Sequence, residues 1–91
     1  MVGIKGEKMG SLTVHVLDED QNPIVGEKVF CNFPWSFLAV LPTNSECYTD
    51  EDGVAEFDEV PAGPVEIYVD GDLQLKVSVG MNDHKDVTVT I

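Results

Sequence analysis

Residues 65–79 read VEIYVDGDLQLKVSV, and this stretch decides the fold class of the chain. On either side of Asp70–Gly71, apolar side chains occupy every second position, which is the two-residue period of a half-buried β-strand. An Asp followed by a Gly is the strongest short signal for a two-residue type I′ turn. The stretch therefore predicts two antiparallel strands joined by a tight hairpin.

The same alternation extends outward from this hairpin along the rest of the chain. Further extended segments are expected at residues 11–16, 27–33, 47–49, 55–57 and 87–91, separated by turn-forming residues. Several short strands with turn signals every 8 to 12 residues, and no helical period, are typical of a small sandwich. We expect an all-β fold, a seven-stranded Greek-key β-sandwich of the immunoglobulin-like or prealbumin-like kind, over residues 11–91. Residues 1–10 are expected to form a flexible N-terminal tail.

The composition fits one globular domain with an acidic surface. A chain of 91 residues with 43% apolar residues has room for one core. It carries 17 Asp and Glu against five Lys and Arg, for a formal net charge of -12. Nucleic-acid binding needs clustered basic residues, and anionic lipid surfaces attract the same groups. We therefore expect a protein partner, through self-association or a neighbouring domain, with no nucleic acid and no membrane.

The sequence is compatible with more than one cellular compartment. The chain has no apolar run of membrane-spanning length, and its opening MVGIKGEKMG lacks the apolar region of a secretory signal. A cytoplasmic location is expected if the chain is complete as written. An extracellular or cell-surface location is expected if it is cut from a larger secreted protein.

Two segments resemble a known family. Residues 22–29 read NPIVGEKV, and residues 49–57 read TDEDGVAEF, followed by VPAG at 60–63. Their order and spacing resemble those of carboxypeptidase regulatory-like domains, which are prealbumin-like, or transthyretin-like, sandwiches. The resemblance implies an accessory, spacer or interaction module with no shared catalytic residues. The chain departs from the pattern at Ala55, at Pro64–Val65 and in the long apolar connection of residues 34–42.

No catalytic constellation is apparent in the sequence. His15 and His84 are the only histidines, the first on the outward face of a strand and the second in a turn. The serines occur in none of the contexts that activate a hydroxyl. Transthyretin-like hydrolases, which share the implied fold, use histidine and arginine, and this chain has no arginine and ends in TVTI. We expect no enzyme, no catalytic residue and no cofactor.

The acidic turns raise the question of a calcium site. Residues 18–22 read DEDQN and begin like a calcium loop, but Pro23 stands where glycine is needed and Val29 where a bidentate glutamate belongs. A weak site formed by Asp50, Asp52 and Asp58 is the alternative. Solvated turn chemistry is the favoured interpretation, and no metal is expected.

The stretch FPWSFLAVLP at residues 33–42 is the candidate interaction segment. A small sandwich does not need all these apolar side chains for its core, and exposed Trp and Phe favour interfaces. The expected contact residues are Phe33, Trp35, Phe37, Leu38 and Val40. A carbohydrate- or peptide-binding role for these aromatics is the alternative function, and a capping role over an open end of the sandwich is the structural alternative.

Cys31 and Cys47 flank this long connection. If the strands on either side of it pair, their α-carbons are expected to approach the 4.4 to 6.8 Å that a disulfide requires. The alternative is two buried thiols that behave as small apolar side chains.

Overall fold

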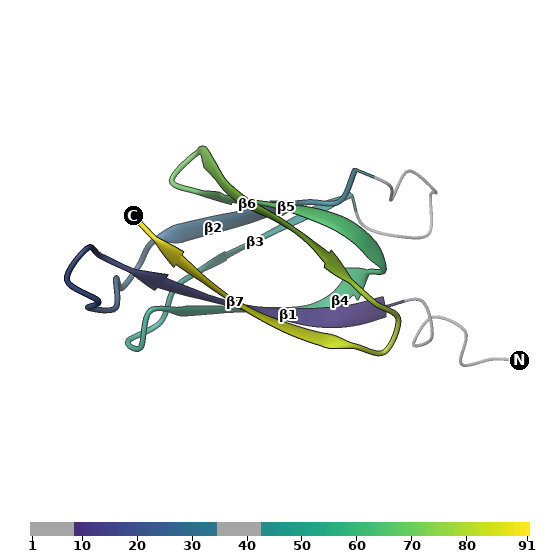
Figure 1. Ribbon diagram of the computed structural model, residues 1–91, viewed down its shortest axis with the longest axis horizontal. Coiled ribbons are helices and arrows are strands. Elements are labelled where there is room, and N and C mark those ends of the chain that lie inside the picture. Colours follow the sequence, from purple (N-terminus) through teal and green to yellow (C-terminus); the bar gives the residue numbers. More distant parts are fainter. Residues whose placement is uncertain (1–8, 35–42) are drawn as a thin grey trace, which may run out of the picture.

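The structure is a computed structural model of the chain and describes residues 9–34 and 43–91 (Figure 1). These residues form seven β-strands and no helix, as the alternating pattern predicts. The strands are β1 (Met9–Leu17), β2 (Lys28–Asn32), β3 (Asn44–Tyr48), β4 (Val54–Pro61), β5 (Gly63–Val69), β6 (Asp72–Val79) and β7 (His84–Thr90). No described segment is a helix with the length and apolarity needed to cross a membrane.

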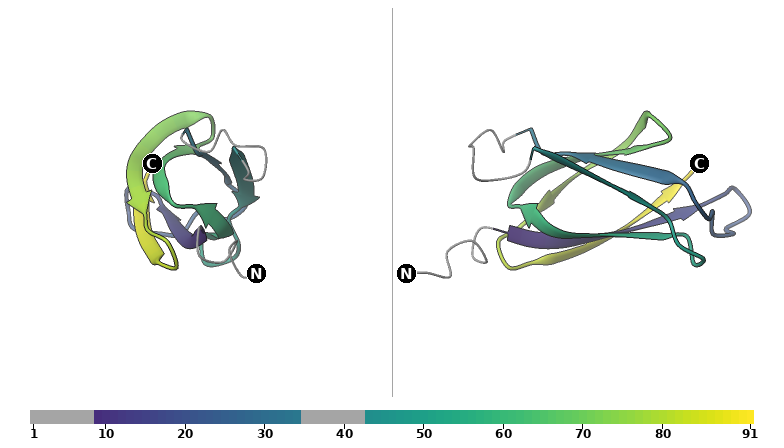
Figure 2. Two further views of the ribbon diagram at one scale, coloured as in Figure 1. Left: turned by 90° about the vertical axis from the view of Figure 1, so that its right-hand side faces the viewer. Right: turned by 180° about the vertical axis from the view of Figure 1, so that it is seen from behind.

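The strands lie in two sheets packed face to face. One sheet has the order β4-β1-β7 and the other the order β3-β2-β5-β6. The view along the long axis in Figure 2 shows the two sheets curving around a common interior. The expected two-sheet sandwich of seven strands is confirmed.

The first and last strands pair in parallel, whereas the other strand pairs are antiparallel. Ser11 of β1 lies opposite His84 of β7, and the pairing continues to Leu17 opposite Thr90. Because the two strands run in the same direction, the start of β1 and the end of β7 lie at opposite ends of the molecule (Figure 1). The molecule is elongated, with extents of 48 × 20 × 18 Å.

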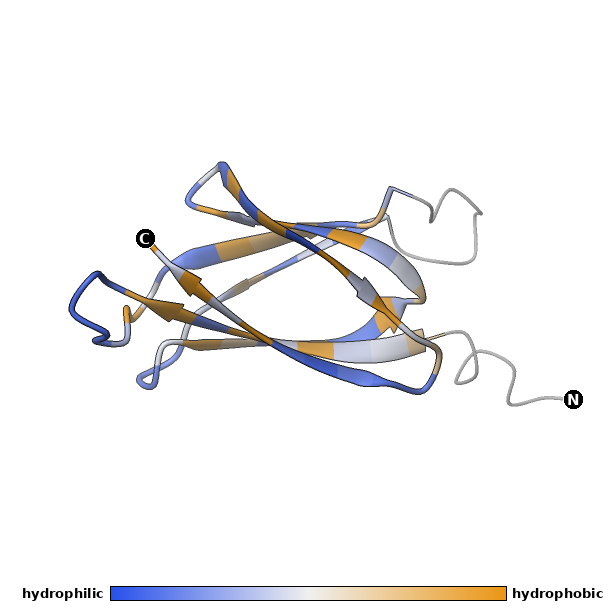
Figure 3. Ribbon diagram, viewed as in Figure 1, coloured by the Kyte–Doolittle hydropathy of each residue, from blue (hydrophilic) through white to orange (hydrophobic). Residues whose placement is uncertain are grey.

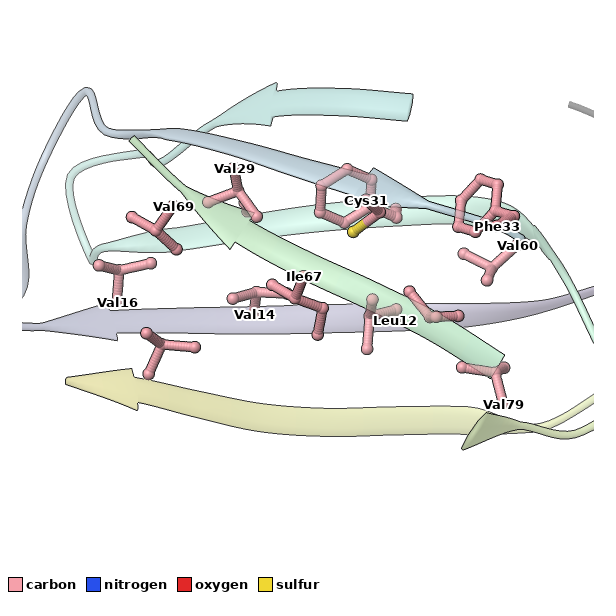
Figure 4. Packing of buried hydrophobic residues seen from close by; sticks show 14 residues of the cluster. Leu12, Val14, Val16, Val29, Cys31, Phe33, Val60, Ile67, Val69 and Val79 are labelled. Carbon is pink, nitrogen blue, oxygen red and sulfur yellow. The ribbon is translucent and has the colours of Figure 1, made fainter. Parts of the chain in front are cut away.

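The core consists of the inward-facing residues of the alternating strands. Apolar and polar residues alternate along β6 in Figure 3, and Figure 4 shows the apolar side chains meeting between the sheets. Leu12, Val14 and Val16 of β1 are at most 1% exposed. The other members are Val29, Cys31, Phe33, Ala55, Phe57, Val60, Val65, Ile67, Val69, Val79 and Val89. Burial of these side chains is the main favourable term holding the two sheets together.

The predicted turns have the expected backbone geometry. Asp70 and Gly71 connect β5 to β6 with φ angles of 53° and 88°. Positive φ at both central residues is the requirement of a type I′ turn. Gly53, in the turn before β4, also has a positive φ, of 73°. The predicted Asp70–Gly71 turn is confirmed.

Strand boundaries differ from the expected ones in several places, among them β3, which is Asn44–Tyr48 rather than the expected 47–49. β1 begins at Met9, inside the expected tail, and β7 begins at His84, a residue expected in a turn. β4 continues to Pro61. A bulge near Glu59, whose φ is 54°, accommodates the shift in register between Gly10 and Leu12, so β4 pairs with β1 on both sides of the shift. The strands are longer because partners that are distant in sequence provide hydrogen bonds to residues of weak strand propensity.

The two family-like segments meet in space at one end of the sandwich. The Thr49 hydroxyl donates to the Ile24 carbonyl at 2.6 Å and accepts from the Glu27 amide at 2.8 Å. Gly53 lies so close to Pro23 that an added Cβ would stand 2.7 Å from the proline Cβ. These two segments therefore form a structural joint between two turns.

Candidate functional site

The outward face of the β4-β1-β7 sheet carries a cluster of polar side chains. Alternation along β1 turns Ser11, Thr13 and His15 outward, and the same period turns His84 and Asp86 outward on β7. The parallel register places Ser11 opposite His84 and Thr13 opposite Asp86. We call these five residues the histidine cluster.

Hydrogen bonds and ion pairs connect the histidine cluster. Ser11 Oγ lies 2.6 Å from His84 Nδ1, and Thr13 Oγ1 lies 3.1 Å from His84 Nε2. The Asp86 carboxylate lies 3.3 Å from His15 Nε2 and 3.6 Å from His84 Nε2. The Asp86 side chain is 63% exposed, so water competes for these contacts and they contribute little to stability.

The histidine cluster contains a serine, a histidine and an aspartate, the three side-chain types of a serine hydrolase, on an outward sheet face. A hydrolase needs unpaired backbone amides directed at the developing oxyanion, and a site from which water is excluded. β1 is a central strand whose backbone pairs with β4 on one side and β7 on the other. Among residues 9–34 and 43–91, no group of three His, Cys, Asp or Glu side chains is arranged to hold a metal ion. The geometry supports a polar network that links β1 to β7.

The outward face of the other sheet carries a shallow depression with an aromatic floor. It is lined by Lys28, Phe30, Asn32, Tyr68 and Gly71 and has a volume of about 310 Å³. We call it the aromatic hollow. Lys28, Phe30 and Asn32 are the outward residues of β2, and Tyr68 is an outward residue of β5.

Cross-strand pairs give the aromatic hollow its shape. Phe30 lies opposite Tyr68, and their rings meet edge to face with centroids 6.0 Å apart. Asn32 lies opposite Glu66, and its amide donates to the Glu66 carboxylate at 2.8 Å. Lys28 Nζ lies 3.7 Å from the Glu46 carboxylate. The hollow thus combines two aromatic rings with fixed polar groups, the usual composition of a small-molecule site.

The acidic turns use their carboxylates to hold their own backbone. Asp18 accepts hydrogen bonds from the amides of Asp20 and Asn22 at 2.8 and 2.9 Å. Asp50 accepts from the amides of Asp52 and Val54 at 2.8 and 3.0 Å in the same pattern. This is the local turn chemistry that Asp favours.

The structure describes only residues 33 and 34 of the candidate interaction segment. Phe33 is 3% exposed and belongs to the core, because it follows Val29 and Cys31 on the inward side of the chain. It is therefore unavailable to an interaction surface, contrary to its place among the expected contact residues. The other residues assigned to that surface, Trp35, Phe37, Leu38 and Val40, lie outside the described residues.

Cys31 and Cys47 are free thiols in the structure. β2 and β3 do pair, but the register places Cys31 opposite Ser45 and Cys47 opposite Val29. The cysteines are thus diagonal neighbours, and such pairs are typically about 7–8 Å apart, beyond the usual span of a disulfide. Burial raises the pKa of the Cys31 thiol to about 12, with a smaller contribution from Cys47. Cys31 is buried in the core, whereas Cys47 is only partly buried, so the alternative of buried, apolar-like thiols describes Cys31 alone.

Sequence reasoning missed both outward clusters. The signal for the aromatic hollow was present, because Lys28, Phe30 and Asn32 alternate with the inward residues of the same strand. The signal for the histidine cluster was weaker. His15 and His84 are 69 positions apart in sequence, and only the parallel pairing of β1 with β7 brings both of them to Asp86.

No family model and no curated protein matches the chain. Solved structures do resemble it. The Bacillus anthracis TIE protein superposes with a TM-score of 0.74 at 16% identity, covering 91% of this chain and 16% of that one. The major pilin SpaD of Corynebacterium diphtheriae superposes with a TM-score of 0.69 at 20% identity, covering 92% of this chain and 30% of that one.

An enzyme also contains a similar sandwich. A 9R-lipoxygenase from Cyanothece superposes with a TM-score of 0.55 at 15% identity, covering 94% of this chain and 17% of that one. At these identities the similarity shows the fold alone. In each case the chain spans less than a third of the protein that it resembles.

Proposed function

We propose that this chain is a non-catalytic spacer and interaction module of a larger protein, of the carboxypeptidase regulatory-like type that its two motifs suggest. The observation that carries the proposal is the parallel pairing of β1 with β7. This pairing brings the chain in at one end of an elongated sandwich and out at the other (Figure 1). A domain inserted in this way holds its two neighbours apart along its long axis.

Two further observations support the proposal. The motif residues Thr49 and Gly53 belong to the joint between the two turns. Neither belongs to the histidine cluster or lines the aromatic hollow. Similar sandwiches occur as small parts of longer proteins, among them a major pilin and the TIE protein. Both observations favour a structural role in a multidomain chain.

The proposal is tested by placing the chain between two stably folded marker domains and measuring the distance distribution between spin labels on those domains. The mean distance does not discriminate, because a flexible linker of this length has a root-mean-square span of roughly 50 Å, close to the 48 Å long axis. The width of the distribution does discriminate. A rigid in-line spacer gives a narrow distribution, whereas a Gly/Ser linker of equal length gives a broad one.

The matched control replaces Val14, a fully buried residue of β1, with Asp. Burying an unpaired charge unfolds the sandwich, so the distribution is expected to broaden to that of the flexible linker. A broad distribution for the unchanged, folded chain would reject the spacer function.

The interaction part of the proposal concerns residues 35–42, whose Trp and Phe content favours a contact surface. We expect the double substitution Trp35→Ser with Leu38→Ser to abolish self-association in sedimentation experiments while the melting temperature is kept. A chain that is monomeric before substitution and melts at a sharply lower temperature after it would assign these side chains to the core instead.

A further inference from the structure

We infer that the aromatic hollow on the outward face of the β3-β2-β5-β6 sheet binds a neutral saccharide. The inference rests on described residues of β2 and β5 and uses neither residues 35–42 nor the chain ends on which the proposed spacer function rests. Its floor is the Phe30–Tyr68 ring pair, and its volume of about 310 Å³ lies at the small end of the range for ligand pockets. A volume of this size suits one or two sugar units.

The side chains around the rings determine the chemistry of the ligand. A pyranose presents a flat C–H face, which stacks on an aromatic ring, surrounded by hydroxyl groups that need polar partners. Asn32 and Glu66 supply those partners. Their mutual hydrogen bond of 2.8 Å holds both planar groups in place and leaves one amide N–H, the amide oxygen and carboxylate lone pairs for a ligand.

The charges select an uncharged ligand. Lys28 lines the hollow with its ammonium 3.7 Å from Glu46, and it repels a cationic ligand at close range. Glu66 beside the hollow and the net charge of -12 repel an anionic one. A neutral molecule avoids both penalties, and Lys28 and Glu66 still contribute charge-assisted hydrogen bonds to its hydroxyls.

Strand pairing disfavours a peptide ligand at this position. Peptides that bind to sheets commonly add a strand to a free edge and pair through their main chain. The hollow lies over β2 and β5, and each of these strands has both edges paired, β2 with β3 and β5, and β5 with β2 and β6. Recognition at the hollow therefore depends on side chains, which suits a hydroxyl-rich ring.

The test is a nuclear magnetic resonance titration of the full chain with four neutral hexasaccharides: maltohexaose, cellohexaose, xylohexaose and chitohexaose. Shallow sites of this kind bind weakly, so we expect a dissociation constant on the order of 1 mM for at least one of them. The expected shifts are concentrated at the amides of Lys28, Phe30, Asn32 and Tyr68. The absence of binding by all four sugars up to about 20 mM would overturn the inference.

Variants locate the binding. Tyr68→Ala is expected to raise the dissociation constant at least tenfold because it removes half of the aromatic floor. Asn32→Ala, which leaves the rings in place, provides a second measurement if Tyr68→Ala fails to fold. The matched aromatic control is Tyr48→Ala, because Tyr48 is 59% exposed on β3 and does not line the hollow.

Each outcome decides for or against the saccharide. Retention of binding by Tyr48→Ala with loss in Tyr68→Ala and Asn32→Ala supports it. Unchanged sugar binding in those two variants, or shifts of the same amides by decaproline and not by any sugar, would overturn it. None of these results affects the distance distribution that tests the spacer function.

Discussion

Gly53 shows how one residue connects two segments that are distant in sequence. Its φ of 73° disfavours any side chain, and an added Cβ would stand 2.7 Å from Pro23 Cβ and 2.8 Å from the Val16 carbonyl oxygen. We expect Gly53→Ala to lower the free energy of unfolding by about 2–4 kcal/mol, because backbone strain and a steric clash act together. Urea denaturation measures the loss.

The control is Gly26→Ala. Gly26 has nearly the same φ, 75°, but a Cβ there meets no atom within 4 Å. Its cost is expected to be about 1 kcal/mol, from backbone strain alone. Equal losses at the two glycines would show that the contact with Pro23 contributes nothing.

The buried Cys31 thiol makes the free energy of unfolding depend on pH in the alkaline range. Its folded-state pKa of about 12 lies above the ordinary value of 9.0. Between these values the unfolded thiol is ionised while the folded thiol keeps its proton, so unfolding releases a proton. The stability contribution is complete below pH 9.0 and is lost as the pH rises toward 12. We expect a slope of at most about 1.4 kcal/mol per pH unit in this range.

The measurement compares urea unfolding from about pH 8 to pH 10.5 in the unchanged chain and in Cys31→Ala. The variant is expected to lose most of this slope, whereas Cys47→Ala keeps the larger part, which comes from the burial of Cys31. Two reactive thiols counted in the unchanged chain, in denaturant without reductant, would establish that no disulfide joins the cysteines. Identical slopes in all three proteins would contradict the prediction.

Individual strands were predictable because their period is local. The outcome at Phe33 shows both the strength and the limit of that reasoning. Alternation with Val29 and Cys31 places Phe33 inward, as the structure finds, yet its position in an apolar stretch suggested a surface role. Pairing between strands was not predictable in the same way. The pairing of β7 with β1 depends on how the whole chain packs, and no local sequence pattern predicts it.

Phe33 also provides a test at the end of an element. Because it is 3% exposed beyond the last residue of β2, Phe33→Ala is expected to cost about 3–5 kcal/mol of folding free energy. Tyr48→Ala, with a side chain that is 59% exposed, is expected to cost less than about 1 kcal/mol. Guanidinium denaturation of both variants measures the difference. A small loss at Phe33 would indicate that the end of the sandwich is open there.

The molecule as a whole carries far more negative than positive charge. With a net charge of -12, repulsion between carboxylates opposes folding, and within residues 9–34 and 43–91 a single lysine, Lys28, forms an ion pair. We expect the melting temperature to rise by several degrees between about 10 and 300 mM sodium chloride, as salt screens the repulsion. The double substitution Glu19→Lys with Glu51→Lys, both at exposed turn positions, is expected to flatten this rise. A salt-independent melt would contradict the prediction.

The parallel pair of β1 and β7 also has a mechanical consequence. When the chain is pulled from its two ends, β1 is drawn toward one end of the molecule and β7 toward the other, while the ladder from Ser11–His84 to Leu17–Thr90 holds them together. The applied force then acts as a shear distributed over all the paired residues of the two strands, so their hydrogen bonds must break together. In the β5–β6 hairpin, by contrast, pulling on Gly63 and Val79 would open the rungs one at a time. In a force spectrometer, we expect a higher rupture force when the chain is held by its ends than when it is held at Gly63 and Val79.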